Sequence, residues 1–171
     1  MPVPTRMLRW MVYALLAVLA LALLGLAAGR LGLLAGQAPS DLGVRDGRLK
    51  APSTRPNSVS SQAALWPGHP RLAYASIAPL PALGDEARTL ARLRSLVEAT
   101  PGARVVQAEG GYLRAEYTTP LMRYTDDVEF WFDSAANVVQ VRSASRLGYS
   151  DRGANRARVE ALRAQLAPAG G

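Results

Sequence analysis

An uncharged segment, residues 10–29, limits the folds open to this chain more than any other feature. Its 20 residues would form a helix about 30 Å long, which matches the hydrocarbon thickness of a bilayer. Trp10 and Tyr13 stand at its start, where aromatic rings favour the headgroup region. A cleaved signal peptide is the alternative, but its apolar region has only about 7–15 residues. We therefore predict a retained single-pass anchor that contacts the lipid bilayer through residues 10–29.

The charges on the two sides of this segment favour opposite orientations. Arg6 and Arg9 precede it and favour a cytoplasmic N-terminus. Arg30 and three further basic residues before position 51 follow it, and a simple count favours the reverse. Because long domains cross membranes largely regardless of charge, we predict an extracytoplasmic domain on the cytoplasmic (inner) membrane of a bacterial cell envelope.

Composition excludes several classes of site. The chain has no Cys and one His, His69, so a disulfide scaffold, a Cys nucleophile and a multi-histidine metal site within one chain are ruled out. The net charge is +7, but no long basic run interleaved with aromatic residues occurs. We therefore expect no nucleic-acid partner, no metal and no cofactor.

The sequence divides into three predicted parts. Residues 1–36 form a cytoplasmic tip and the anchor helix, residues 37–70 a Pro/Ser-rich tether partly packed on the domain, and residues 71–171 an α+β domain with a disordered C-terminal tail. Five prolines between positions 39 and 70 prevent a continuous helix there.

Apolar periodicity in the last part predicts the order β-α-β-β-β-β-α. Short turns between strands indicate a mainly antiparallel sheet with helices on one face. The predicted strands cover residues 72–77, 104–107, 112–118, 127–132 and 138–146, and the predicted helices cover 85–99 and 151 to about 167.

Charged residues constrain how the last two strands pair. Alternation puts Asp127 and Glu129 on the face of strand 127–132 opposite its apolar side chains. The pairing that aligns the apolar faces of both strands places Glu129 directly opposite Arg142, and Asp127 diagonal to Arg142 and Arg146. We interpret Asp127, Glu129 and Arg142 as structural ion pairs, each facing pair contributing roughly 0.2–1 kcal/mol.

The same carboxylates allow two other interpretations. Asp127 or Glu129 would be the general base of a hydrolase if it lay in a cleft with a perturbed pKa. Asp126, Asp127 and Glu129 would bind a hard cation, although adjacent Asp126 and Asp127 point to opposite faces of a strand.

A polar group where the last strand meets the final helix is a candidate binding site. Arginine side chains and the N–H groups of a helix start both attract anions. An exposed apolar patch around Trp66 or Trp131 would instead bind an envelope protein. We expect His69 to pack in a loop. The ligand-binding residues predicted for an anionic small molecule are Arg142, Arg146, Tyr149, Asp151, Asn155 and Arg156.

Four stretches resemble the domain-of-unknown-function family 1499. They are LGVRDGRL (42–49), PNSVSSQ (56–62), DDVEF (126–130) and RSASRLGYSDRGANRARVEALR (142–163). The resemblance implies a small membrane-anchored or exported protein of the kind found in bacteria and plastids, with no established biochemical activity. It also implies that the segments beginning at residues 42 and 56 belong to the domain. The family usually has Cys-Pro-x-x-Pro-Asn-Cys where this chain has residues 52–58, so both Cys positions carry other residues here.

Together these observations predict a membrane-anchored envelope protein with a binding or structural role rather than an enzyme. The alternative is the hydrolase described above.

Overall fold

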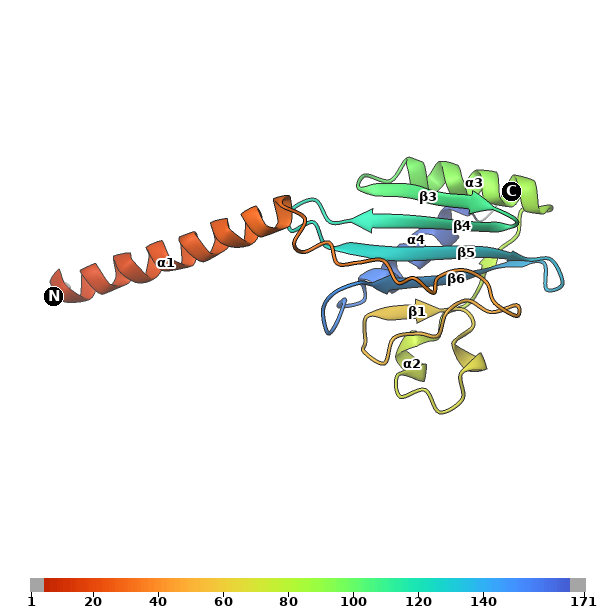
Figure 1. The fold of residues 1–171 in the computed structure, drawn as a ribbon, viewed down its shortest axis with the longest axis horizontal. Helices are drawn as coiled ribbons and strands as arrows, with labels where there is room; N and C mark the ends of the chain where they lie inside the picture. The colour runs from red at the N-terminus through yellow and green to blue at the C-terminus, as the bar shows by residue number, and fades with distance from the viewer. Residues whose placement is uncertain (1–4, 167–171) are drawn as a thin grey trace.

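The computed structural model describes residues 5–166 of the chain (Figure 1). The first residues of the predicted cytoplasmic tip and the predicted disordered tail lie outside this range. Its elements are α1 (Thr5–Arg30), β1 (Ser58–Ser60), η1 (Ala63–Leu65), α2 (Leu72–Ala75), β2 (Leu80–Pro81), α3 (Glu86–Glu98), β3 (Ala103–Glu109), β4 (Tyr112–Thr118), β5 (Thr125–Asp133), β6 (Val138–Ser145) and α4 (Ala154–Leu166).

Helix α1 extends away from the rest of the molecule (Figure 1) and is long and apolar enough to cross a membrane. It ends in a Schellman motif. The Leu33 N–H donates to the Ala28 carbonyl and the Gly32 N–H to the Gly29 carbonyl, each over 3.0 Å. Gly32 takes a positive φ of 77°, which a residue without Cβ adopts at little cost.

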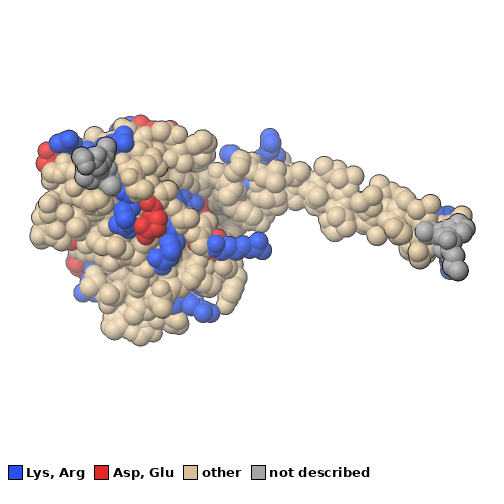
Figure 2. Space-filling view, turned by 180° about the vertical axis from the view of Figure 1, so that it is seen from behind, with Lys and Arg blue, Asp and Glu red and all other residues tan. Residues whose placement is uncertain are grey.

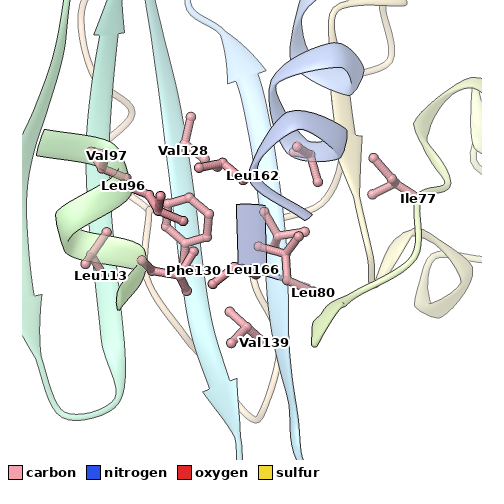
Figure 3. Close-up of a cluster of buried hydrophobic side chains, with 14 of the residues drawn as sticks. Ile77, Leu80, Leu96, Val97, Leu113, Val128, Phe130, Val139, Leu162 and Leu166 are labelled. Atoms are coloured by element: carbon pink, nitrogen blue, oxygen red, sulfur yellow. The ribbon is translucent and has the colours of Figure 1, made fainter. Parts of the chain in front are cut away.

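The domain is built on an antiparallel sheet in the order β1-β6-β5-β4-β3, with β2 also pairing with β6. Helices α3 and α4 cover one face of the sheet, as predicted (Figure 1). The main core lies between them and the sheet around Phe130, which is fully buried (Figure 3). The α+β class is confirmed.

The predicted register between β5 and β6 is confirmed. Glu129 lies opposite Arg142 and Asp133 opposite Val138. The intervening turn is closed by Asp133, whose carboxylate accepts the Ala136 N–H over 3.1 Å.

The strand predicted over residues 72–77 is wrong. Residues Leu72–Ala75 form the single-turn helix α2, in which the Ser76 N–H donates to the Leu72 carbonyl. A four-residue element is too short to show a helical period, so apolar residues around a turn resemble an alternating strand. The edge partner of β6 is instead β1, within the stretch of small residues that suggested a tether.

The other face of the sheet is covered by the chain that follows α1. Residues 36–51 run across β5 and β6 on the side away from α3 and α4 (Figure 1). A Cβ on Gly36 would lie only 2.8 Å from the Cβ of Arg146, and one on Gly47 would lie 3.7 Å from the ring of Trp131. The charged face of the sheet is therefore buried as well.

Candidate functional site

Glu129 and Arg142 form a buried ion pair under the covering segment. Their side chains are 0% and 4% exposed, and Nη1 of Arg142 lies 3.1 Å from Oε2 of Glu129. Oε1 of Glu129 accepts the Tyr112 hydroxyl over 2.9 Å and the Gly43 N–H over 2.8 Å. Burial, together with the neighbouring Glu129 carboxylate, raises the pKa of Tyr112, so this phenol stays protonated and donates.

A second cluster surrounds Arg146. Its Nε and Nη2 reach the two carboxylate oxygens of Asp127, each over 2.8 Å, in a bidentate pair. Nη2 also reaches Glu116 over 2.6 Å. Asp127, which was predicted to lie diagonal to Arg142 and Arg146, therefore pairs with Arg146. We call these residues and the Glu129–Arg142 pair the carboxylate–arginine layer.

The contacts of Arg146 and Glu116 shift the pKa values of both groups. Hydrogen bonding to Asp127 raises the pKa of Arg146 despite the opposing effect of burial. Burial raises the pKa of Glu116, but hydrogen bonds from Arg146 and Arg104 outweigh it and the net pKa is lowered. Glu116 and Arg146 are therefore charged and paired with each other at neutral pH.

The two candidate general bases do not face open space. Asp127 is 1% and Glu129 0% exposed, and each is held by an arginine. A general base must come within hydrogen-bonding distance of its substrate. The geometry of the layer favours the structural interpretation.

On the helix-covered face, Asn155 is the centre of a second buried network, which we call the Asn155 hub. Its side-chain amide donates to the Asn57 carbonyl (3.1 Å), the Ser145 hydroxyl (3.1 Å) and the Asp151 carboxylate (2.8 Å). Its carbonyl oxygen accepts the Ser143 hydroxyl over 2.5 Å. One side chain therefore joins α4, β6 and the segment before β1.

Arg158 completes the hub and was missed by sequence reasoning. Its guanidinium reaches Asn155 (2.7 Å), Ser143 (2.8 Å) and Asp126 (2.6 Å), and its Cζ lies 4.6 Å from the ring centre of Tyr117. The available signal was helical spacing, because Arg158 lies three residues after Asn155 and shares its face of α4.

The sheet separates the six predicted ligand-binding residues. Arg142 and Arg146 belong to the carboxylate–arginine layer, whereas Asn155 lies on the opposite face. The reason is strand parity, since Arg142 and Arg146 alternate with Ser143 and Ser145.

Of the other three residues, Asp151 contacts Asn155, whereas Tyr149 and Arg156 have other partners. Asp151 accepts the backbone N–H groups of Gly153 (3.1 Å) and Asn155 (2.9 Å), as expected for a residue that caps α4. Tyr149 is 63% exposed, and its hydroxyl accepts from Arg71 over 3.1 Å. Arg156 donates to the backbone carbonyls of Tyr74 and Ser76. Across the described residues these six side chains do not line one pocket.

The remaining candidates are also placed. Asp126 faces α4 while Asp127 faces the other way, and residues 5–166 contain no group of three His, Cys, Asp or Glu side chains arranged for a metal ion. His69 packs in a loop, with Nε2 3.1 Å from the Pro52 carbonyl. Trp66 lines a hollow of about 570 Å³, and within the described part of the chain its buried indole N–H has no partner.

A cavity of about 350 Å³ lies where α1 meets the domain. Among the six predicted ligand-binding residues, Arg146 alone lines it. We call it the junction cavity, and its polar lining comes from Arg30, Arg104, Glu116, Thr118, Arg123, Thr125 and Arg146. Figure 2 shows basic side chains gathered where α1 leaves the domain.

These features define a small antiparallel α+β domain with two buried polar networks, behind an N-terminal helix that is long and apolar enough to span a membrane. The chain belongs to the family described as "Protein of unknown function (DUF1499)", whose profile matches residues 39–166. No curated protein and no solved structure matches the chain.

The stretches that carry the family resemblance are joined by the buried networks. Gly43 in the first stretch donates to Glu129 in the third. Gln62 in the second accepts the Leu49 N–H over 2.8 Å, and the carbonyl of Asn57 accepts from Asn155 in the fourth. Much of the family pattern in this chain is therefore accounted for by fold-stabilising contacts.

Proposed function

We propose that this chain is a single-pass membrane protein whose α+β domain is a non-catalytic binding module held at the surface of a cell-envelope membrane. The observation that carries the proposal is α1, which buries none of its most apolar stretch against the domain. Leu15 and Leu21, for example, are each 68% exposed. A helix that is apolar all round requires a lipid or protein surface to cover it.

The sealed carboxylates support binding rather than hydrolysis. Every oxygen of Asp127 and Glu129 accepts a hydrogen bond, and both groups lie beneath the covering segment. Freeing either as a base would require breaking a buried ion pair, which is strongly unfavourable.

Our proposed ligand is anionic, and we place it in the junction cavity. Arg142, Asn155 and Arg156 are occupied by internal partners. The cavity beside Arg146 is also lined by Arg30 and Arg123, and Glu116 is its single carboxylate. This position lies beside the end of the anchor.

Membrane integration is tested by washing membranes with alkaline carbonate. We expect the full chain to stay in the pellet and a Leu16→Arg, Leu19→Arg variant to be released. Leu65→Arg, a change at an exposed domain position, is the matched control and should stay with the membrane. Release of the unaltered chain would overturn the proposal.

Orientation is tested with the same full chain, which is free of cysteine. Single substitutions Ala135→Cys in the exposed β5–β6 turn and Thr5→Cys at the start of α1 are exposed to a membrane-impermeant maleimide on intact cells. We expect labelling of Cys at position 135 at once and at position 5 only after permeabilisation. The reverse pattern would place the domain in the cytoplasm.

A further inference from the structure

We infer that the β4–β5 loop, residues 119–124, docks into the bilayer beside α1, and that Arg30 and Arg123 bind the headgroups of anionic phospholipids. The inference rests on the proposed function, because it requires α1 to span the membrane. It identifies the anionic ligand of the junction cavity as lipid.

The β4–β5 loop lies against the last turns of α1. A Cβ on Gly29 would lie 2.7 Å from the carbonyl oxygen of Met122, and one on Gly25 would lie 3.3 Å from its Cε. Gly25 precedes Arg30 by five residues, which corresponds to about 7.5 Å along a helix axis. The Met122 side chain therefore contacts α1 inside the uncharged segment, below the level of Arg30.

The β4–β5 loop and the residues that follow α1 expose apolar side chains. Leu121 at the loop tip is 62% exposed and Tyr124 is 41% exposed. Leu31 and Leu33, which follow α1, are 76% and 70% exposed. Exposed apolar side chains gathered at one end of a domain mark an interaction surface, and a tyrosine suits the headgroup region of a bilayer. Because α1 carries this surface to the bilayer, lipid is the occupant.

The loop presents these residues in a closed conformation. The Thr119 N–H donates to the Tyr124 carbonyl over 2.8 Å, and the Tyr124 N–H donates to the Thr119 hydroxyl over 2.9 Å. Arg123 has a φ of 59°, a left-handed conformation that an arginine adopts at a cost. These two hydrogen bonds close the loop backbone and fix the point from which the Arg123 side chain extends.

Arg30 and Arg123 bring two positive charges to this end of the domain. Arg30 and Arg123 line both the junction cavity and a neighbouring hollow of about 510 Å³. In residues 5–166 neither forms an ion pair, whereas Arg104 and Arg146 in the same cavity both pair with Glu116. Guanidinium groups bind phosphate in a bidentate manner, and anionic bilayer surfaces attract basic residues next to a membrane span. Two unpaired arginines at the headgroup level therefore favour a phosphodiester headgroup.

Loop insertion is tested in the full chain reconstituted in liposomes that contain an anionic phospholipid. Single-Cys variants Leu121→Cys and Ala135→Cys are labelled with an environment-sensitive dye. We expect blue-shifted emission and protection from iodide quenching at position 121, and a water-exposed dye at position 135. Equal quenching at both positions would overturn loop insertion.

Headgroup binding is tested by energy transfer from a dye at position 121 to trace amounts of acceptor-labelled anionic or zwitterionic phospholipid. We expect transfer to favour the anionic lipid. The double variant Arg30→Gln, Arg123→Gly should lower this preference by about an order of magnitude, whereas Arg88→Gln at an exposed position on α3 should leave it unchanged. Replacing Arg123 with Gly also removes the left-handed strain, so misfolding is not the expected cause of the loss.

The outcomes separate the two proposals. A chain that carbonate releases contradicts membrane anchoring itself. A chain that remains integral but shows no anionic preference, or whose preference is abolished by soluble glycerol phosphate, contradicts lipid binding alone.

Discussion

Burial increases the effect of the Glu129–Arg142 ion pair on the stability of the domain. As facing residues on an exposed sheet they would contribute little, but beneath residues 36–51 each group depends on the other for charge compensation. The pairing could be predicted from the sequence because strand alternation and the need to align two apolar faces allow one register. The burial could not, because the covering segment has no periodic pattern.

We expect Arg142→Ala to destabilise the full chain by about 3–5 kcal/mol, because it leaves the Glu129 carboxylate buried and unpaired. Chemical denaturation in detergent measures the change. A double-mutant cycle with Glu129→Gln should give a larger coupling energy than the cycle between Glu129 and Arg146, since Arg146 is bound to Asp127. Equal couplings would show that the register does not determine the pairing.

The Asn155 hub carries a second prediction at this scale. Asn155→Ala removes hydrogen bonds to Asn57, Ser143 and Asp151 and leaves buried polar atoms unsatisfied, so we expect a loss of about 2–4 kcal/mol. Ser134→Ala in the exposed β5–β6 turn is the control and should change stability by less than about 0.5 kcal/mol. If Asn155→Ala leaves the free energy of unfolding almost unchanged, water satisfies the polar atoms that the Asn155 side chain binds.

Among the elements, those with several turns or alternations were predictable. The helix over 85–99 and the strands β4, β5 and β6 lie within a few residues of their predicted bounds, because each shows a full amphipathic period. The short elements β1 and α2 were not, because three or four residues contain no period. Side chains alternate between the two faces of a strand, which made the Glu129–Arg142 pair predictable. The same alternation places Arg142 and Arg146 on the face of the sheet opposite Asn155, so the predicted ligand-binding residues do not form one site.

The contact between α1 and the β4–β5 loop gives an element-scale prediction. Gly29→Val would place a side chain against the Met122 carbonyl, so we expect the loop to move off the helix while α1 still inserts. Faster hydrogen exchange over residues 119–124, with unchanged carbonate resistance, is the expected result. The control is Ala27→Val, on an exposed position of the same helix. Unchanged exchange in Gly29→Val would mean that loop and helix are not in contact.

For the whole molecule, the apolar helix, the α+β class and the family could be predicted from the sequence. Each rests on a pattern that extends over many residues: the uncharged segment, the apolar periodicity and the four stretches that resemble the family. The junction cavity depends on where α1 ends relative to β4 and β5, residues about 90 positions apart in the chain, and no local pattern encodes that distance. The proposed lipid contact therefore depends on the placement of Arg30, Arg123 and the β4–β5 loop beside the end of α1.

The pH dependence of stability is a property of the whole molecule. Burial raises the pKa of Asp151, but its bonds from the Tyr74 hydroxyl and the Asn155 and Gly153 N–H groups outweigh this, and the net pKa is lowered, as for Glu116. A carboxyl whose pKa is lowered by folding stabilises the protein at pH values above its pKa in the unfolded chain, which is about 4. This contribution is lost as the pH falls through the pKa of the folded state. Burial raises the pKa of Tyr74 and Tyr117, so their contribution is present below about pH 10 and lost as the pH rises through their folded values.

We therefore expect the melting temperature of the full chain in detergent to be level from about pH 5 to 9 and to fall on both sides. Circular dichroism between pH 3 and 11 measures it. Asp151→Asn should lower the plateau and make the acid limb shallower, because the variant has one fewer depressed carboxyl to protonate. Arg156→Gln, next to the same helix start but without a titrating group, should leave the steepness of the acid limb unchanged. An acid limb of equal steepness in Asp151→Asn and the unaltered chain would show that Asp151 does not contribute to the acid transition.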